Sequence, residues 1–322
     1  MNNLPGVSVI LPILNEEKYL AATAEAILKQ DYQGEWEIIF SVGPSRDRTM
    51  DVAKELAAKN PRIHVVENPT GRTPNALNIA IAQSQYPIIC RIDGHAEVST
   101  HYISDAVRSL LDTGAVNVGG LMAAEGITSF EKSVARAMRS SLGVGASRFH
   151  TGGTAGSVDT VYLGTFRKDA LLAAGGYDER FTRAQDWELN FRLRKNGGTI
   201  WFDPSLVVIY RPRSSLQTLA RQYFHYGRWR HVVSRSHKGS VNFRYLAPPT
   251  ALIINLLSLL AGFFQPWLFL PLGIYLASLI IGSLLIGKSW GERVRLPLIL
   301  LTMHMVWGLG YLTSPRDLLE RA

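Results

Sequence analysis

The sequence has 322 residues, of which 47% are hydrophobic, and it carries a formal net charge of +8. This length suits one large domain or two ordinary ones. A single cysteine, Cys90, excludes an internal disulfide framework and fits a reducing compartment. Residues 1–6 lack the basic and apolar regions of a secretory signal, so we expect the residues ahead of any membrane segment to stay in the cytoplasm.

The first part of the chain predicts alternating strands and helices. Continuous apolar runs are typical of strands buried on both faces of a parallel sheet. Such a run occupies residues 7–11, further strands are expected at 36–42, 63–67 and 87–92, and helical patterns occupy 16–29, 48–59 and 75–82. Repeated units of this kind imply a parallel sheet, whose ligands bind beyond the carboxyl ends of the strands. The polar residues that follow each strand are therefore the first to inspect.

The middle of the chain is less regular. Apolar residues recur at helical spacing in 129–141, and this helix would lie either on a membrane surface or on the sheet. The glycine-rich segment 143–157 predicts a mobile loop over the site. Further strands are expected at 157–163 and 199–202, and a helix at 187–195.

Three apolar segments without a charged residue close the chain, at 247–264, 267–287 and 296–313. A helix needs about 20 apolar residues to cross a bilayer, so each segment is near the required length. By the positive-inside rule the basic regions beside them are cytoplasmic, and three full spans would put residues 314–322 outside. His304 interrupts the third segment, which leaves a re-entrant or interfacial helix open. The alternative is an entirely soluble fold with buried helices.

A basic cluster precedes the first apolar segment. Between residues 205 and 246 there is no Asp or Glu, and there are eight basic residues: Arg211, Arg213, Arg221, Arg228, Arg230, Arg235, Lys238 and Arg244. Clusters beside a membrane segment bind anionic lipid headgroups. No groove-reading motif accompanies the charge, so nucleic acid is not an expected partner.

Several motifs occur in a fixed order. They are VSVILPILNEEKY at 7–19, NPTGRTPNALNIA at 68–80, RIDGHA at 91–96, VDTVYLGTFRK at 158–168, GGYDERFTRAQDWELNFRLR at 175–194 and RQYFHYGRW at 221–229. This set resembles the family-2 glycosyltransferases with the GT-A fold. In particular it is similar to the succinoglycan-biosynthesis glucosyltransferase branch, including its Asp-Gly-His variant and its C-terminal membrane region. The resemblance covers essentially the whole chain.

The resemblance implies an α/β protein with three parts. A GT-A catalytic domain with a nucleotide-binding, mostly parallel sheet would span 1–204, a basic amphipathic region at the membrane interface 205–246, and about three transmembrane helices 247–322. It also implies an inverting, metal-dependent, non-processive transfer of a sugar from a nucleotide-sugar donor to a polyprenyl-linked saccharide acceptor in polysaccharide biosynthesis. The expected location is the bacterial cytoplasmic membrane, as a multi-pass protein with a cytoplasmic catalytic domain.

The Asp-Gly-His motif follows the strand expected at 87–92. Asp93 and His95 are two residues apart beyond the strand end, where both side chains could reach one cation. A divalent cation neutralises the charge that grows on a departing nucleoside diphosphate. Carboxylate plus imidazole suits Mn²⁺, with Mg²⁺ as the other possibility. The alternative is a simple turn with an Asx hydrogen bond.

The resemblance also assigns residues to the donor. These are Pro12, Asn15, Glu16, Gly71, Asn75, Asn78 and Asp93. Glu17 is either a further nucleotide contact or ordinary first-turn helix charge. One departure concerns the base, because most family members follow the second strand with Asp-Asp-Gly-Ser and this chain has SVGPSRD at 41–47. Recognition of uracil by a carboxylate is therefore in doubt.

The catalytic base of the family is the Asp of a Glu-Asp pair before a helix, and it maps to Asp186. An unperturbed aspartate is ionised at neutral pH and can accept the proton of the acceptor hydroxyl. The preceding residue is Gln185 rather than Glu, and it is expected near the acceptor or diphosphate. The alternative role for Asp186 is that of a helix N-cap. Glu188 is either a supporting partner or a plain helix residue.

Gln222, Arg228 and Trp229 resemble the family's Gln…Arg-Trp element, with wider spacing than in processive synthases. Arginine can hold a phosphate with two hydrogen bonds, and tryptophan can stack on a sugar. The alternative is a helix on the membrane surface. Two other functions stay open: a polyprenyl-phosphate sugar synthase, and a catalytically inactive subunit that binds a nucleotide sugar for assembly.

Overall fold

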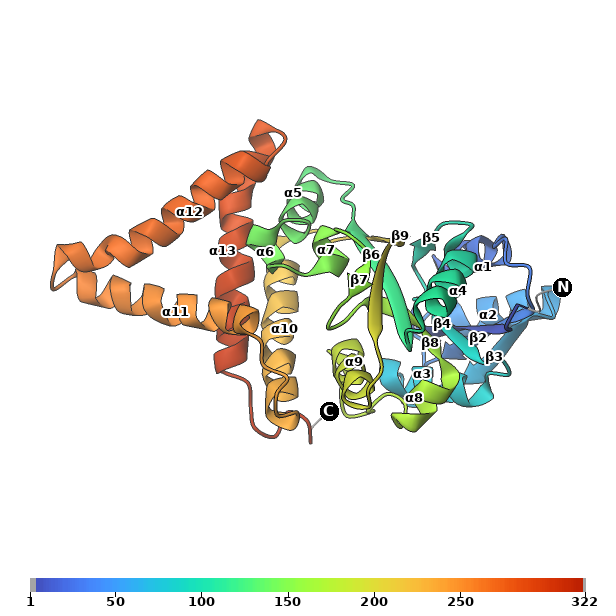
Figure 1. The fold of residues 1–322 in the computed structure, drawn as a ribbon. Coiled ribbons are helices and arrows are strands. Elements are labelled where there is room, and N and C mark those ends of the chain that lie inside the picture. The colour runs from blue at the N-terminus through green and yellow to red at the C-terminus, as the bar shows by residue number, and fades with distance from the viewer. Residues whose placement is uncertain (1–3, 321–322) are drawn as a thin grey trace. The chain divides into compact units, whose positions relative to one another are not determined.

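The computed structural model describes residues 4–320, whose strands form one mixed sheet (Figure 1). The strand order is β3-β2-β1-β4-β8-β6-β9-β5, and β7 pairs with β9. The bounds are β1 Val7–Ile13, β2 Trp36–Val42, β3 Ile63–Glu67, β4 Ile88–Arg91, β5 Glu97–Val98, β6 Asn117–Ala124, β7 Gly156–Ser157, β8 Tyr162–Arg167 and β9 Ile200–Tyr210.

Strands β3, β2, β1 and β4 are parallel, as the apolar runs predict. Val7 pairs with Trp36 on one side of β1 and with Ile88 on the other. All seven residues of β2 are buried, and five of them are apolar, as expected for a strand inside a parallel sheet. Because the four strands point the same way, the polar residues after them meet at one edge of the sheet.

The remaining strands are antiparallel, and here the sequence was less informative. The strand expected at 157–163 lies instead at β8, and the one expected at 199–202 continues to Tyr210. Strand β6 has no strong strand pattern because it contains Gly119 and Gly120. A Cβ atom on Gly120 would lie 1.7 Å from the Leu206 carbonyl oxygen, so a glycine is required where β9 comes close.

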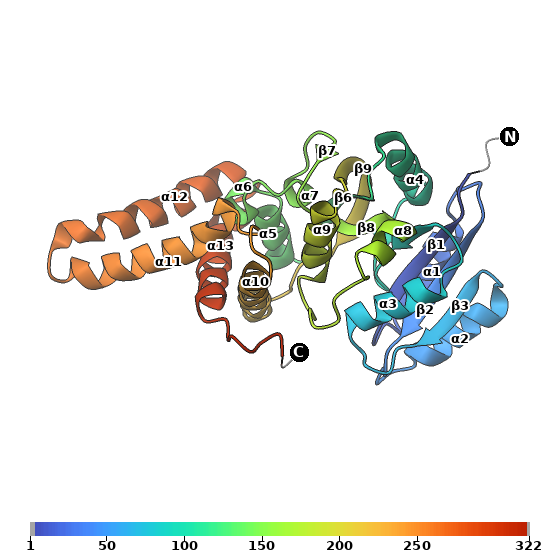
Figure 2. The same cartoon turned by 60° about the horizontal axis from the view of Figure 1, so that its bottom comes forward.

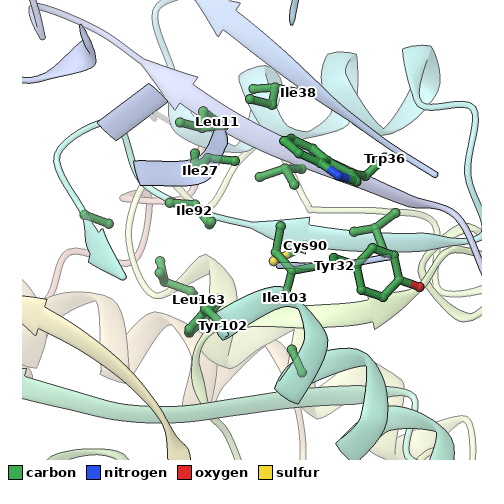
Figure 3. Close-up of a cluster of buried hydrophobic side chains, with 14 of the residues drawn as sticks. Leu11, Ile27, Tyr32, Trp36, Ile38, Cys90, Ile92, Tyr102, Ile103 and Leu163 are labelled. Atoms are coloured by element: carbon green, nitrogen blue, oxygen red, sulfur yellow. The ribbon is translucent and has the colours of Figure 1, made fainter. Parts of the chain in front are cut away.

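Contacts divide the described chain into two compact units. The first, here the catalytic unit, contains residues 4–122 and 152–209. Its helices are α1 Leu20–Leu28, α2 Thr49–Lys59, α3 Thr73–Gln83, α4 Tyr102–Thr113, α8 Lys168–Ala173 and α9 Gln185–Lys195. Its apolar core lies between the sheet and the helices, and Figure 3 shows Leu11, Ile27 and Trp36 among the side chains packed there.

The second unit, here the helical unit, contains residues 123–151 and 210–320. Its elements are α5 Ser129–Met138, α6 Ser141–Val144, α7 Arg148–Thr151, α10 Leu216–Ser236, α11 Phe243–Gly262, the 3-10 helix η1 Pro266–Phe269, α12 Leu270–Ile286 and α13 Trp290–Leu312. Residues 123–151 thus pack with the C-terminal helices, although they fall inside the range expected for the catalytic domain.

The helix expected at 129–141 and the mobile loop expected at 143–157 both contribute helices to the helical unit. Helix α5 begins with a capping box formed by Thr128 and Glu131, and it packs on α13. The glycine-rich segment expected to be a loop contains α6 and α7.

The apolar segments at the end of the chain are helices, as expected. Among the described residues, three helical segments are long and apolar enough to cross a membrane: Phe243–Gly262, Pro266–Ile286 and Trp290–Leu312. Both views show α11 and α12 joined at a common turn, and Figure 1 shows the two helices diverging from that turn toward α13 (Figures 1 and 2). Pro248 and Pro249 lie within α11, and Pro297 lies within α13.

Candidate active site

A cleft of about 250 Å³ opens in the catalytic unit at the carboxyl ends of the parallel strands. Its walls come from the segments that follow β1, β3 and β4 and from the first turns of α3 and α9. The lining residues are Pro12, Ile13, Leu14, Glu16, Asn68, Gly71, Arg72, Thr73, Ala76, Arg91, Asp93, Gly94, His95 and Gln185. The cleft therefore contains most of the residues expected to bind the donor.

Arg91, the last residue of β4, links the two carboxylates that the sequence singled out. Its side chain is only 4% exposed. Its Nε and Nη2 atoms donate to Asp93 Oδ1 at 3.2 and 3.1 Å, and Nη1 donates to Asp186 Oδ1. Asp93 and Asp186 are thus held on one guanidinium, although 93 residues separate them in the chain.

The charges of this triad depend on one another. Burial raises the pKa of the Asp186 carboxyl above its ordinary value, and the nearby Asp93 carboxylate also raises it, while Arg91 acts in the opposite direction. Burial opposes the charged form of Arg91, but the two carboxylates keep its pKa well above the ordinary value. The phenol of Tyr177 is buried beside them, and burial raises its pKa as well.

Asp186 lies in the first turn of α9, after a residue with unusual backbone geometry. Ala184 has φ 58°, in the left-handed region, and α9 begins at Gln185. Ala184 is the N-cap residue and no side chain caps the helix, so the N-cap alternative for Asp186 is wrong. The Asp186 carboxylate binds Arg91 instead.

Glu188 and Arg192 fix α9 to the preceding turn. Glu188 is 1% exposed and accepts hydrogen bonds from Arg192 at 2.6 and 2.7 Å. The same guanidinium donates to the carbonyl oxygens of Ala174 and Gly176. Glu188 therefore supports the helix that carries Asp186.

Asn75 and Asn78 face the loop that leads to α9. The Asn78 amide donates to the Tyr177 carbonyl oxygen at 2.8 Å and accepts from the Tyr177 backbone N–H at 2.8 Å. Both asparagines also donate to the carboxylate of Glu179. Neither residue lines the cleft. In this structure they join α3 to the 177–179 loop, and the Asn75 Oδ1 atom is buried without a hydrogen-bond partner among the described residues.

His95 and Glu16 come from different loops of the cleft wall and meet. His95 Nδ1 lies 2.7 Å from Glu16 Oε1, and Asp93 is two residues away on the same loop as His95. No group of three His, Cys, Asp or Glu side chains within residues 4–320 is arranged to hold a metal ion. The donors present therefore suit a cation that takes part of its coordination from the oxygens of a ligand, as Mg²⁺ does with phosphates.

The loop after β1 is tied to the loop after β2. Asn15, with φ 56°, accepts from the Arg46 backbone N–H at 2.8 Å, and its own N–H donates to Ser45 Oγ. Glu17 accepts from the Arg48 backbone N–H at 3.1 Å. Asn15 and Glu17 thus shape the wall of the cleft, and of this loop only Leu14 and Glu16 line it.

The segment after β2 contains one carboxylate, Asp47, which accepts hydrogen bonds from Thr49 and from the Glu17 backbone N–H. Gly43 approaches Gly71, and a Cβ atom on Gly43 would lie 3.1 Å from the Gly71 Cα atom. Gly71 itself has φ 66°, where glycine is favoured. The segment after β2 therefore packs against the Gly71 turn, and Gly71 lines the cleft.

The remaining predicted residues are on α10, in the helical unit. Gln222 is 7% exposed and donates to the hydroxyls of Tyr210 and Tyr226 at 2.8 and 2.7 Å, while its Oε1 atom has no hydrogen-bond partner among the described residues. The Arg228 guanidinium stacks 4.5 Å from the Phe224 ring centroid. Trp229 is 4% exposed, so its ring is part of the packing of that unit.

Two arginines that line the cleft were not predicted from the sequence. Arg72 precedes α3 and lines the cleft with the first turn of that helix. Arg91 could have been found, because a charged residue inside a buried strand such as IICR is rare unless it is paired.

Comparisons with known proteins find a matching family and relatives of similar length. Residues 8–173, just over half of the chain, match the family described as Glycosyl transferase family 2. The chain is 30% identical to the succinoglycan biosynthesis protein ExoA of Rhizobium meliloti, covering 97% of this chain and 96% of that protein. It is 26% identical to a Methanococcus voltae dolichyl N-acetyl-alpha-D-glucosaminyl phosphate 3-beta-D-2,3-diacetamido-2,3-dideoxy-beta-D-glucuronosyltransferase, covering 95% of each chain.

A solved structure has a similar fold over almost the whole length. The mannosyltransferase PcManGT from Pyrobaculum calidifontis, in complex with GDP-Man and Mn²⁺, superimposes with a TM-score of 0.62 at 18% identity, covering 97% of this chain and 88% of that one. This likeness confirms the GT-A type of α/β fold. Together with the matched residues and the full-length relative, it leads to one assignment: the chain is a glycosyltransferase that belongs to glycosyl transferase family 2.

Proposed function

We propose that the protein transfers a sugar, with inversion, from a nucleotide-sugar donor to a lipid-linked saccharide at the bacterial cytoplasmic membrane. The observation that carries this proposal is the Arg91 guanidinium, which holds Asp93 of the donor cleft and Asp186 together. A leaving-group site and a base must flank the same sugar carbon for in-line displacement. The arrangement in the catalytic unit supplies both groups.

In the proposed reaction an acceptor hydroxyl attacks the anomeric carbon while the bond to the diphosphate breaks. Asp186 accepts the proton of that hydroxyl, and Arg91 favours the ionised form of the Asp186 carboxyl and orients it. Gln185 lines the cleft next to Asp186, where its amide can hydrogen-bond to the sugar or the diphosphate. The new glycosidic bond forms on the face opposite to the leaving group.

The diphosphate would lie at the N-terminus of α3. Arg72, Gly71 and Thr73 line the cleft there, and backbone N–H groups at a helix start attract anions. Asp93, with His95 and Glu16 nearby, would hold Mn²⁺ or Mg²⁺ against the diphosphate. When bound, such a cation neutralises the charge that develops on the leaving group. The complex of PcManGT with both GDP-Man and Mn²⁺ supports this assignment.

Two observations support a lipid-linked acceptor. The helical unit presents apolar helices long enough to enter a bilayer, next to the basic helix α10. The two full-length relatives are named for succinoglycan biosynthesis and for transfer to a dolichyl-phosphate-linked sugar. Gln222, Arg228 and Trp229 on α10 remain the proposed acceptor-side residues.

The experiment compares Asp186→Asn with wild type in release of nucleoside diphosphate from a panel of UDP-, GDP-, ADP- and dTDP-sugars, with and without Mn²⁺. Loss of a positioned general base lowers kcat by roughly 10²- to 10⁴-fold, and donor binding should change little. Asp112→Asn, at an exposed position of α4, is the matched control.

Each contrary outcome has a distinct meaning. Wild-type turnover by Asp186→Asn would refute the assigned base. If the wild type released nucleotide from no donor in the panel, the inactive binding subunit would be favoured. If mild acid released the transferred sugar from the lipid as a monosaccharide, rather than attached to the acceptor saccharide, transfer to a polyprenyl phosphate would replace transfer to a saccharide hydroxyl.

A further inference from the structure

Helices α11 and α12 form a hairpin that the rest of the helical unit leaves largely uncovered. Large apolar side chains along both helices and at the turn are exposed: Leu256 50%, Leu257 61%, Leu260 62%, Phe263 78%, Phe264 84%, Trp267 70%, Leu270 63%, Ile274 60% and Leu285 80%. The lengths of the two segments, 20 and 21 residues, match the thickness of a bilayer.

Polar groups of this hairpin are turned inward. Ser258 Oγ donates to the Leu268 carbonyl oxygen at 2.6 Å and accepts from the Leu272 backbone N–H at 3.2 Å. Asn255 and Ser258 are 7% and 5% exposed. Ser283 of α12 is also buried, so these polar side chains do not face the outer surface of the hairpin, which suits contact with lipid.

Helix α13 differs, although it is as long as a membrane span. In its apolar part 39% of the residues are buried, against 22% for α11 and 11% for the segment Pro266–Ile286. Both views show α10 lying along it (Figures 1 and 2). His231 Nδ1 on α10 contacts the Tyr311 carbonyl oxygen, and Arg235 contacts Ser314 and Pro315 beyond the end of α13.

The other part of α13 is covered by elements from the middle of the chain. Arg136 of α5 pairs with Glu292 at 3.6 Å. His304 Nε2 lies 2.8 Å from the Leu142 carbonyl oxygen of α6, and its Nδ1 lies 3.1 Å from the Tyr275 hydroxyl. Besides α11 and α12, α13 thus contacts α10, α5 and α6, none of which is among the described helices that are long and apolar enough to cross a membrane.

The charge on α10 opposes a passage of α10 and α13 together through the bilayer. Helix α10 carries Arg221, Arg228, Arg230 and Arg235, and basic side chains are costly at the centre of a bilayer. Since α10 covers α13, the two helices must stay on the same side of the membrane core. Basic residues also mark both ends of the hairpin at its base: Arg244 in the first turn of α11, and Lys288, Arg293 and Arg295 after α12.

We infer that the chain crosses the bilayer twice, out along α11 and back along α12, and that α13 lies at the membrane surface beside α10. The C-terminal residues then return to the side of α10, rather than lying outside as three full spans would require. This inference rests on the membrane insertion included in the proposed function, but on no step of the sugar transfer.

Single-cysteine labelling with a membrane-impermeant maleimide tests the inference. The variants are Lys238→Cys between α10 and α11, Gln265→Cys at the hairpin turn and Glu320→Cys near the C-terminus, all at exposed positions. Wild type is the blank, because its Cys90 is buried. In spheroplasts only Gln265→Cys should react, and in inverted vesicles Lys238→Cys and Glu320→Cys should react together.

The contrary outcomes are separable from a failure of the proposed function. Labelling of Glu320→Cys in spheroplasts, with Lys238→Cys protected, would establish a third crossing and overturn the inference. Protection of Gln265→Cys from both sides would overturn the double crossing. Release of the wild type from membranes by alkaline carbonate would overturn membrane insertion altogether. None of these results depends on donor turnover.

Discussion

At the scale of residues, the buried guanidinium of Arg91 determines how two carboxylates can share one site. Asp93 and Asp186 would repel each other without a cation between them, and Arg91 supplies that positive charge. Because its planar group reaches both side chains, it also sets their orientation. Arg91 is therefore a positioning residue for the proposed base.

We expect Arg91→Gln to lower kcat strongly and to move the acid limb of the kcat–pH profile to higher pH. Burial already raises the pKa of Asp186, and removing Arg91 removes the interaction that opposes this rise. Asp186 acts only when ionised, so its activity is lost as pH falls through its pKa, which would then be higher. In Arg91→Lys the acid limb should lie closer to that of wild type. Lysine keeps the positive charge but cannot hydrogen-bond to both carboxylates as the planar guanidinium does.

The measurement is kcat and KM of donor turnover across pH. Arg108→Gln, at an exposed ion pair on α4, is the control and should match wild type. A purely structural role for Arg91 would lower the amount of folded enzyme without moving the acid limb. An unchanged limb in Arg91→Gln would therefore refute the positioning role.

The order of the motifs in the sequence predicted which residues lie in the cleft, but not which side chains hydrogen-bond to one another there. The motif around Asp93 and His95 placed both residues in the cleft, since a loop after a buried strand can be recognised from its apolar run. The partner of Asn78 is the Tyr177 backbone, 99 residues away, and no local pattern indicates such a contact. The hydrogen bond from Arg91 to Asp186 could not be predicted for the same reason, because the two residues are 95 positions apart.

At the scale of elements, glycines allow α10, α11 and α13 to pack closely. A Cβ atom on Gly227 of α10 would lie 2.0 Å from the Trp307 carbonyl oxygen, and one on Gly310 of α13 would lie 2.1 Å from the Phe224 carbonyl oxygen. Gly308 is similarly close to α11, because its Cβ atom would lie 2.6 Å from the Pro248 carbonyl oxygen. Small residues at such crossings bring backbones together, as in helix pairs within membranes.

Gly227→Ala is expected to destabilise the helical unit by about 1–3 kcal/mol, the usual cost of inserting a methyl group into a close contact. The check is thermal unfolding of the detergent-solubilised protein. Gly273→Ala on α12 is the matched control, because its Cβ atom would meet no atom within 4 Å. Equal unfolding temperatures for the two variants would contradict the tight α10–α13 contact.

Elements with a strong periodic pattern were predicted well, and those defined by pairing were not. Strands β2 and β3 match their predicted bounds because each is a short, mostly apolar segment that ends where polar residues and turns begin. Strand β6 was not predicted, because its two glycines lower its strand preference. At least one of them, Gly120, is required only because β9 lies so close. The coverage of α13 by α10 and α5 likewise arises only from tertiary contacts, so length and apolarity alone made it look like a third span.

At the scale of the whole molecule, the two units carry different chemistry. All residues that line the cleft belong to the catalytic unit, and the uncovered apolar hairpin belongs to the helical unit. The excess positive charge is concentrated in residues 205–246, most of which also belong to the helical unit. The cleft and the apolar surface that suits lipid thus belong to separate parts of one chain.

The uncovered hairpin has a kinetic consequence for a substrate that also resides in lipid. Enzyme and acceptor would meet by lateral diffusion in two dimensions, so the encounter rate would follow the acceptor's mole fraction in the bilayer and not its amount per volume. Adding inert phospholipid to proteoliposomes at constant total acceptor should therefore reduce the initial velocity in proportion to the dilution. A velocity insensitive to added phospholipid would indicate that the acceptor reaches the enzyme from the aqueous phase.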